Sequence, residues 1–308
     1  MAPDLSVSLG PLRLKSPVMC ASGTFGFGEE YTDYLDLSQL GAVVTKTITL
    51  QPREGNPPPR LAETPAGLVN SIGLANPGLE VFLREKLPFL RRRRVPVVVS
   101  IAGNTVEEYA ELARALEGTA GIAAVEANIS CPNVKEGGRL FGSRPATAAD
   151  VTRVIRRSTS LPLLVKLPPL FPGLMEVAGA VEEAGADALA VTNTLPAMVI
   201  DVQARRPVLG AGTGGLSGPA IRPVAVYLVW QVATAVRLPL IGMGGIATAS
   251  DALEFLIAGA SAVAVGTATF GNPRAMVEIS TGIAAYLEER GMSNLREIIG
   301  SLRPGGCS

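Results

Sequence analysis

The feature that most constrains the fold is a repeated alternation between short apolar runs and segments with helical spacing. Continuous apolar runs are typical of parallel strands that helices cover on both faces. Eight of them in succession predict one (β/α)₈ barrel of the TIM type. Because no break in composition divides the 308 residues, we interpret 1–308 as a single domain. The predicted strands are 17–20, 42–45, 95–101, 122–129, 161–167, 188–194, 238–242 and 262–266.

Segments outside this alternation decorate the two ends of the predicted barrel. Residues 5–9 and 12–14, joined by Gly10-Pro11, predict a β-hairpin placed to plug the bottom of the barrel. The connections 49–77 and 195–216 are long and contain no predicted strand, and such loops are usually functional. We therefore expect extended loops over the C-terminal face. The predicted helices are 29–40, 80–94, 105–117, 147–158, 173–184, 219–235 and 272–290.

Composition excludes several classes of function. The 27 basic and 27 acidic residues balance, so no overall field favours nucleic acid or an anionic membrane. There is no apolar run of membrane-spanning length and no signal-peptide pattern, and three cysteines cannot all pair, which together predict a cytoplasmic protein. Histidine is absent, so acid–base chemistry must use Cys, Lys, Asp or Glu, and we predict no metal site.

Polar residues gather where the predicted strands end. Lys46, Asn128, Cys131, Lys166 and Asn193 all end or follow a strand. The carboxyl ends of barrel strands form the catalytic face of this architecture, so these side chains predict one site. The plainer alternative for each lysine is an ordinary residue whose ammonium reaches solvent.

Cys131 lies in the most informative stretch, 126–142. Its strand should end at Pro132, and Gly137, Gly138 and Gly142 predict a flexible loop before the next helix. A cysteine at the mouth of a strand, between asparagines, is a candidate for acid–base chemistry. The alternative is a structural thiol beside a turn, because free cysteine is among the most buried residue types.

Two glycine motifs suggest anion binding. The run 210–215 matches G-x-G-x-x-G, but it follows a polar segment instead of a buried strand, so we interpret it as a flexible loop. The run 242–247 does lie between a strand and a helix, and Gly266-Thr267 follows the last strand. The loops after strands seven and eight of a barrel commonly bind phosphate, which predicts a phosphate monoester here.

Five motifs in register give the chain a specific resemblance. Residues 46–47, 70–74, 128–138, 192–194 and 244–245 are similar to those of the dihydroorotate dehydrogenases, and in particular to the class 1B catalytic subunit. The resemblance implies an FMN-containing barrel that oxidises (S)-dihydroorotate to orotate in de novo pyrimidine (UMP) biosynthesis. It also implies that Cys131 is the catalytic base.

The same resemblance implies the binding residues. Ser100 stands where many relatives carry an asparagine that contacts the flavin. The implied substrate-binding residues are Lys46, Asn70, Ser71, Ile72, Gly73, Leu74, Asn128, Asn133, Asn193 and Thr194. The implied FMN-binding residues are Ala21, Ser22, Lys46, Thr47, Ser100, Asn128, Lys166, Thr192, Gly218, Gly244, Gly245, Gly266 and Thr267.

The class 1B resemblance further implies a partner. A second subunit with FAD and a [2Fe–2S] cluster would pass electrons from FMN to NAD, on a dimer of this chain, which gives a heterotetramer. The chain cannot supply such a cluster itself, because the cluster needs four cysteine ligands and the sequence has three cysteines, Cys20, Cys131 and Cys307.

Other functions remain compatible with the pattern. One is a fumarate-dependent enzyme of class 1A, and another is a different pyrimidine-converting flavin barrel, similar to the substrate domain of dihydropyrimidine dehydrogenase. A flavin-free lyase or isomerase with a phosphorylated substrate would also use the glycine loops. It would leave Cys131 and the asparagines without a role.

Overall fold

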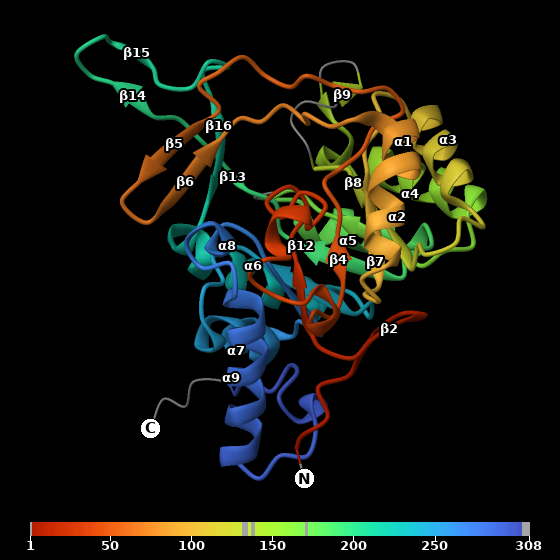
Figure 1. Ribbon diagram of the computed structural model, residues 1–308, viewed down its shortest axis with the longest axis vertical. Coiled ribbons are helices and arrows are strands. Elements are labelled where there is room, and N and C mark those ends of the chain that lie inside the picture. Colours follow the sequence, from red (N-terminus) through yellow and green to blue (C-terminus); the bar gives the residue numbers. More distant parts are fainter. Residues whose placement is uncertain (1, 131–134, 137–138, 170–171, 304–308) are drawn as a thin grey trace.

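The predicted barrel is present. A computed structural model describes residues 2–130, 135–136, 139–169 and 172–303. Eight strands form one sheet in the order β3-β18-β17-β12-β11-β8-β7-β4, and every pair in it is parallel. The helices surround this sheet (Figure 1), which confirms the (β/α)₈ fold. The strands are β3 Val18–Cys20, β4 Val43–Val44, β7 Val97–Ile101, β8 Ala124–Asn128, β11 Leu163–Lys166, β12 Ala188–Val191, β17 Leu240–Met243 and β18 Ala262–Val265.

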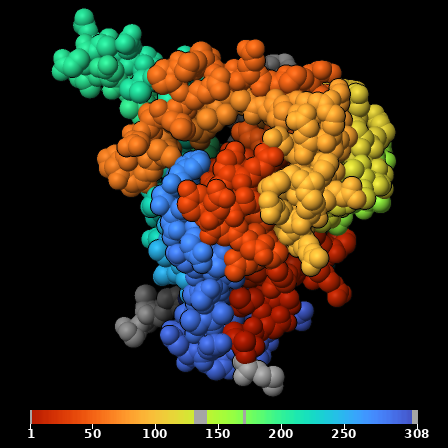
Figure 2. Space-filling model, viewed as in Figure 1, coloured from red at the N-terminus to blue at the C-terminus, as the bar shows by residue number. Residues whose placement is uncertain are grey.

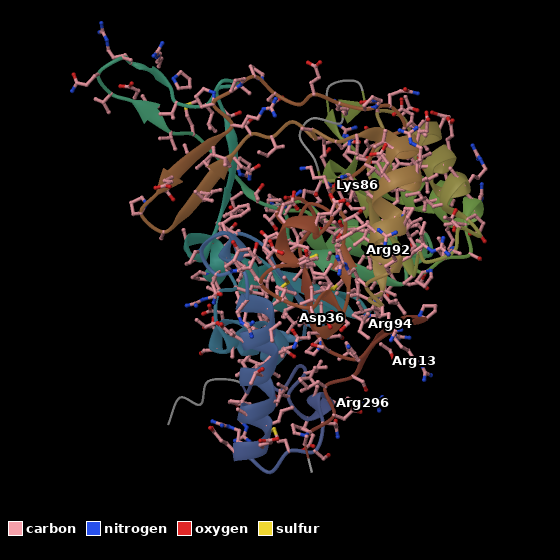
Figure 3. All side chains as sticks on the ribbon, viewed as in Figure 1. Arg13, Asp36, Lys86, Arg92, Arg94 and Arg296 are labelled. Atoms are coloured by element: carbon pink, nitrogen blue, oxygen red, sulfur yellow. The ribbon has the colours of Figure 1, made fainter. Side chains whose placement is uncertain are left out.

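Six of the seven predicted helices are present, and the helices α7 Ala249–Ala258 and α8 Ala268–Gly271 were not among the predicted ranges. The run of arginines starts at Arg91, the last residue of α2, and Arg92 and Arg94, which Figure 3 labels, are exposed, as expected for a solvated helix end. In the described ranges we find no helix with both the length and the apolar character needed to span a membrane. The helices are α1 Gly78–Val81, α2 Leu87–Arg91 (with the π-turn Phe82–Lys86 between them), α3 Val106–Leu116, α4 Pro145–Ser158, α5 Leu174–Glu183, α6 Arg222–Ala235, α7 Ala249–Ala258, α8 Ala268–Gly271 and α9 Ala275–Glu289.

The helix predicted over 29–40 is wrong. The segment forms only two short 3₁₀ turns, Glu29–Tyr31 and Leu37–Gln39. Asp36 between them has an extended backbone, and its carboxylate accepts a hydrogen bond from the backbone N–H of Ser38 at 2.9 Å. Aspartate competes for backbone donors in this way and therefore starts a new turn instead of continuing a helix.

A cysteine closes the seam of the barrel. The strands β3 and β4 stand at the two ends of the sheet order. Across this seam the Cys20 Sγ accepts from the backbone N–H of Val44 at 3.2 Å and donates to its carbonyl at 3.4 Å. Burial raises the pKa of the Cys20 thiol to about 12, so the thiol is neutral at physiological pH.

Replacing Cys20 by alanine should therefore destabilise the protein without altering its catalytic groups. The change leaves both backbone groups of Val44 without their sulfur partner in the interior, and an unsatisfied buried polar group costs about 1–3 kcal/mol. The urea midpoint of unfolding should fall, and Cys20→Ser, which keeps a donor and an acceptor, should lose less. An unchanged midpoint in the alanine variant would mean that the seam does not depend on this side chain.

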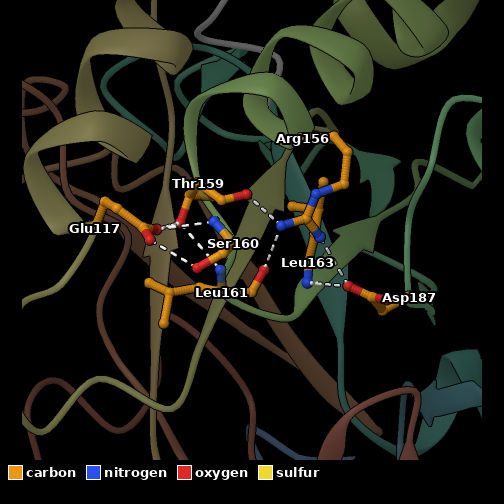
Figure 4. A network of polar contacts seen from close by, with 7 residues as sticks. All are labelled: Glu117, Arg156, Thr159, Ser160, Leu161, Leu163 and Asp187. Atoms are coloured by element: carbon orange, nitrogen blue, oxygen red, sulfur yellow. Dashed lines mark hydrogen bonds and ion pairs between the residues drawn. The ribbon is translucent and has the colours of Figure 1, made fainter.

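A polar network fixes the amino-terminal end of the barrel (Figure 4). The Glu117 carboxylate accepts from Thr159 Oγ1 and from the backbone and hydroxyl of Ser160, the latter two at 2.8 and 2.7 Å. These bonds lower the pKa of Glu117 to about 2. Arg156 pairs with Asp187 at 3.0 Å beside it. This end of the barrel is thus structural, which leaves the opposite end for chemistry.

The amino-terminal hairpin is also confirmed. Its strands are β1 Val7–Leu9 and β2 Leu12–Leu14, paired antiparallel. A Cβ placed on Gly10 would lie 2.8 Å from that of Asp187, the residue before β12. The hairpin therefore sits at the amino-terminal end of the strands, which is the bottom of the barrel.

A second sheet, which the sequence did not reveal, stands over the other end. It is antiparallel in the order β13-β16-β6-β5, and it joins the two long connections. The interpretation of 210–215 as a flexible loop is therefore wrong for Gly214 and Gly215, which belong to β16. Beyond this sheet a hairpin projects from the body of the molecule (Figures 1 and 2). The sheet strands are β5 Leu61–Thr64, β6 Gly67–Asn70, β13 Leu195–Ala197 and β16 Gly214–Ser217, the hairpin strands are β14 Ile200–Asp201 and β15 Arg206–Pro207, and a short ladder pairs β9 Lys135–Glu136 with β10 Arg139–Leu140.

Candidate functional site

A cavity of about 1130 Å³ opens at the carboxyl ends of the barrel strands, beneath the second sheet. Its size is suitable for a cofactor together with a small substrate. The structure brings all but three of the predicted site residues to its wall. Those that line it are Ala21, Ser22, Lys46, Thr47, Asn70, Ser71, Ile72, Gly73, Leu74, Asn128, Lys166, Thr192, Asn193, Thr194, Gly218, Gly244, Gly245, Gly266 and Thr267.

The three exceptions have different reasons. Cys131 and Asn133 lie outside the described residues. Ser100 is fully buried and does not line the cavity, because Thr47 stands in front of it and the two hydroxyls are 2.9 Å apart. The structure thus places Ser100 behind the wall of the cavity.

Two lysines give the cavity its charge. Lys166 ends β11, is only 5% exposed, and donates its Nζ to Ser22 Oγ at 3.4 Å. Lys46 follows β4, and its Nζ lies 3.9 Å from the Cβ position of Gly23. The alternative of a lysine reaching solvent does not hold for Lys166. Among the described lining residues these two carry the only charged side chains, so the cavity favours an anionic ligand.

A chain of hydrogen bonds crosses the floor of the cavity. Asn193 Nδ2 donates to Ser130 Oγ at 2.6 Å, and Ser130 Oγ donates to Asn128 Oδ1 at 2.8 Å. Asn128 Nδ2 in turn donates to Thr47 Oγ1 at 3.3 Å. The side chains after β12, β8 and β4 therefore hold one another in place. Ser130, which the sequence analysis missed, is a member of this chain, and its position beside Cys131 was the available signal.

The second sheet delivers Asn70 to the same cavity. Asn70 ends β6, and its Nδ2 donates to the carbonyl of Gly215 on β16 at 3.1 Å. Gly215 has no room for a side chain, because a Cβ there would meet Thr194 Oγ1. The glycines of β16 thus allow the sheet to approach the loop after β12, so that Asn70, Asn193 and Thr194 share one wall.

The glycine loops form the other end of the cavity. Gly244 and Gly245 have φ of +129° and +75°, which favour glycine. Their backbone N–H groups and that of Gly266 have no acceptor among the described residues. Thr267 Oγ1 donates nearby to Ser217 Oγ at 2.8 Å. Unpaired backbone donors beside a hydroxyl fit a phosphate group, and this is the fit expected for the phosphate of FMN.

A buried acid lies inside the barrel, below Asn128 on strand β8. Glu126 is on β8, two residues before Asn128 and therefore on the same face of the strand. It is 1% exposed, and its Oε1 has no hydrogen-bond partner among the residues described. Glu126 has no role that its sequence context would indicate, because an acid inside an apolar run gives no signal of the direction in which its side chain points.

Comparison with known proteins agrees with this geometry. The family model described as "Dihydroorotate dehydrogenase" matches residues 4–287. A protein of Desulforudis audaxviator named dihydroorotate dehydrogenase B (NAD(+)), catalytic subunit, is 59% identical over 302 residues, which cover 98% of each chain. Proteins of the same name from Geotalea uraniireducens and Desulforamulus reducens are 55% and 56% identical, and the matches cover 97% of this chain and 98% of each relative. The chain therefore belongs to the dihydroorotate dehydrogenase family.

Proposed function

We propose that this chain is the catalytic subunit of an NAD⁺-dependent dihydroorotate dehydrogenase. It would oxidise (S)-dihydroorotate to orotate in de novo pyrimidine biosynthesis, with FMN bound in the barrel cavity. The observation that carries the proposal is the cavity itself, where two lysines and several asparagine amides converge with backbone donors that have no acceptor in the described part of the chain. The names of the relatives support the NAD⁺-dependent type.

The amide groups suit the substrate. Dihydroorotate is a ring with two amide-like edges and one carboxylate, so its recognition needs donors and acceptors as well as a cation. Asn70, Asn128 and Asn193 each carry a donor and an acceptor, and Lys46 supplies positive charge for the carboxylate. We assign substrate binding to these four, with 71–74 and Thr194 on the same wall. We extend the assignment to Asn133, which lies outside the described residues. The bonds that orient Asn128 and Asn193 would reduce the entropy lost on binding.

The glycine loops and Lys166 suit the cofactor. FMN, when bound, would supply the hydride acceptor for C6 of dihydroorotate. Gly218, Gly244, Gly245 and the Gly266-Thr267 pair would hold its phosphate, and Ala21, Ser22, Thr47 and Thr192 would line the rest of its site. The Lys166 ammonium would stabilise negative charge on the flavin ring from its buried position. Ser100 would act only through Thr47.

We assign the base to Cys131. The proton at C5 of dihydroorotate must leave together with the hydride at C6, so a basic group has to lie beside the ring. Strand β8 and Ser130 bring the chain to the cavity immediately before Cys131. The backbone N–H of Gly142 donates to the carbonyl of Ile129 at 2.9 Å, so the described residues that flank 130–141 lie close together beside Ser130. A thiolate here would accept the proton.

The purified chain should contain one FMN, and Gly266→Ala should weaken its binding. A Cβ on Gly266 would lie 3.5 Å from the nearest protein atom, so the apoprotein accommodates it, whereas a phosphate on the Gly266 N–H would be displaced. The dissociation constant measured by flavin fluorescence should rise at least about tenfold. Gly179→Ala, in open space on α5, is the matched control and should bind FMN normally. A colourless protein that does not bind added FMN would contradict the proposal.

Electrons would leave through a second subunit. The relatives are named as catalytic subunits, which implies a separate partner. We propose that this partner carries FAD and a [2Fe–2S] cluster, and that two copies of each chain form a heterotetramer. The alternative acceptor, fumarate, would require no such partner.

A further inference from the structure

The ion pair between Arg222 and Asp251 contacts the glycine loop 244–248 from the side of helices α6 and α7. Asp251 lies in the first turn of α7 and is 5% exposed. Its Oδ2 accepts from the backbone N–H groups of Ala247 and Thr248, both at 2.9 Å, and its own N–H donates to Thr248 Oγ1 at 3.2 Å. The aspartate therefore fixes the end of the loop that leads into α7.

Arg222 connects Asp251, which caps the amino terminus of α7, to the rest of the proposed phosphate site. It is the first residue of α6, and its Nη1 forms an ion pair with Asp251 Oδ1. Its backbone N and its Cβ each lie 2.9 Å from the Cβ position of Gly245. The short turn Pro219–Ile221 separates it from Gly218, whose carbonyl is 2.7 Å from that same position. One arginine thus joins Asp251, Gly245 and the Gly218 segment.

The charge of the pair is important for an anion site. A carboxylate that takes two loop N–H groups would repel a phosphate bound to the donors beside them. Arg222 neutralises that carboxylate in a partly buried setting, where charges are screened less than in water. Its Nε also lies 3.6 Å from Oε2 of the more exposed Glu254, so Asp251 is the buried one of two carboxylates that face the arginine. The N–H groups of Gly244 and Gly245, which Asp251 does not use, remain available to a ligand.

We propose that Arg222 and Asp251 are positioning residues for the phosphate of FMN. They do not touch the ligand. They hold loop 244–248 against the Gly218 segment and cancel the charge of the cap. This inference rests on the proposed FMN site. A positioning role can be told from a purely structural one by comparing two flavins. If the pair acts on the phosphate, its loss lowers the affinity for FMN and leaves the affinity for riboflavin, which lacks the phosphate, nearly unchanged.

The test is the affinity of the full-length apoprotein for FMN and for riboflavin, measured by fluorescence titration. In Arg222→Met the dissociation constant for FMN should rise at least about tenfold, with riboflavin affinity within about twofold of the native value. Arg222→Lys, which keeps the charge, should recover part of the FMN affinity. Arg153→Met, the same substitution in an exposed ion pair on α4, should change neither.

Three outcomes would overturn the inference. Equal losses for both flavins would show a purely structural pair, and no loss of FMN affinity in Arg222→Met would show that the pair does not act on the phosphate. If Arg222→Met does not fold, Arg222→Gln is measured instead, because it removes the positive charge and keeps a hydrogen-bond donor for Asp251, and the same selective loss is expected. Native protein that binds neither flavin would overturn the FMN proposal itself, a result distinct from failure of the pair alone.

Discussion

Replacing Cys131 by alanine should lower the rate of flavin reduction by dihydroorotate by about 10²–10⁴-fold, the range for loss of a general base. FMN should stay bound, because the glycine loops and Lys166 on the cavity wall do not depend on this side chain. Stopped-flow absorbance of the flavin under anaerobic conditions measures the rate, and the absorbance of the purified variant measures its FMN content.

The serine variant and the pH dependence sharpen this test. An unperturbed thiol has a pKa of about 8.5, so the native rate should rise toward alkaline pH. Cys131→Ser should retain a small rate that rises only at higher pH, because a hydroxyl is a poorer base than a thiol. Cys20→Ala is the control, since the buried Cys20 lies at the barrel seam and should not affect reduction. Native kinetics in Cys131→Ala would place the base elsewhere.

The second large effect concerns the electron acceptor. The isolated chain, supplied with dihydroorotate, should reduce an artificial dye and should not reduce NAD⁺. The run 210–215, which matches G-x-G-x-x-G, runs into strand β16 and lacks the strand-to-helix context that a dinucleotide site requires. The related run 242–247 is assigned above to the phosphate of FMN. Three cysteines are also too few to hold a [2Fe–2S] cluster. A spectrophotometric assay that follows NADH and dye separately measures both activities.

Addition of the electron-transfer subunit should restore NAD⁺ reduction. The control is that subunit alone with dihydroorotate, which should give no turnover. Efficient NAD⁺ reduction by the isolated chain would reject the two-subunit proposal, and rapid turnover of the isolated chain with fumarate would indicate an enzyme of class 1A.

The barrel was predictable because its signal is local. Each buried strand is a continuous apolar run, and each polar residue at its end, such as Lys166 or Asn193, is adjacent in sequence to the strand that positions it. The parallel sheet then brings these ends together without further information. The predicted residues therefore converge on one cavity even though they are distant in sequence.

The second sheet was not predictable for the opposite reason. Strand β16 has the sequence Gly-Gly-Leu-Ser and pairs with β6, so Gly215 lies opposite Asn70, a partner 145 positions earlier. Neither strand has apolar alternation, and the pairing depends on contacts between distant segments. The same holds for Arg222 and Asp251, whose pairing becomes visible only when α6 and α7 pack side by side.

The central claim is that this chain oxidises dihydroorotate with bound FMN. The most direct measurement is to mix the purified yellow protein with dihydroorotate in the absence of oxygen and to record the visible spectrum together with orotate formation. We predict that the flavin absorbance bleaches and that one orotate appears for each FMN reduced. A flavin that keeps its oxidised spectrum at saturating dihydroorotate, with no orotate formed, would contradict the account.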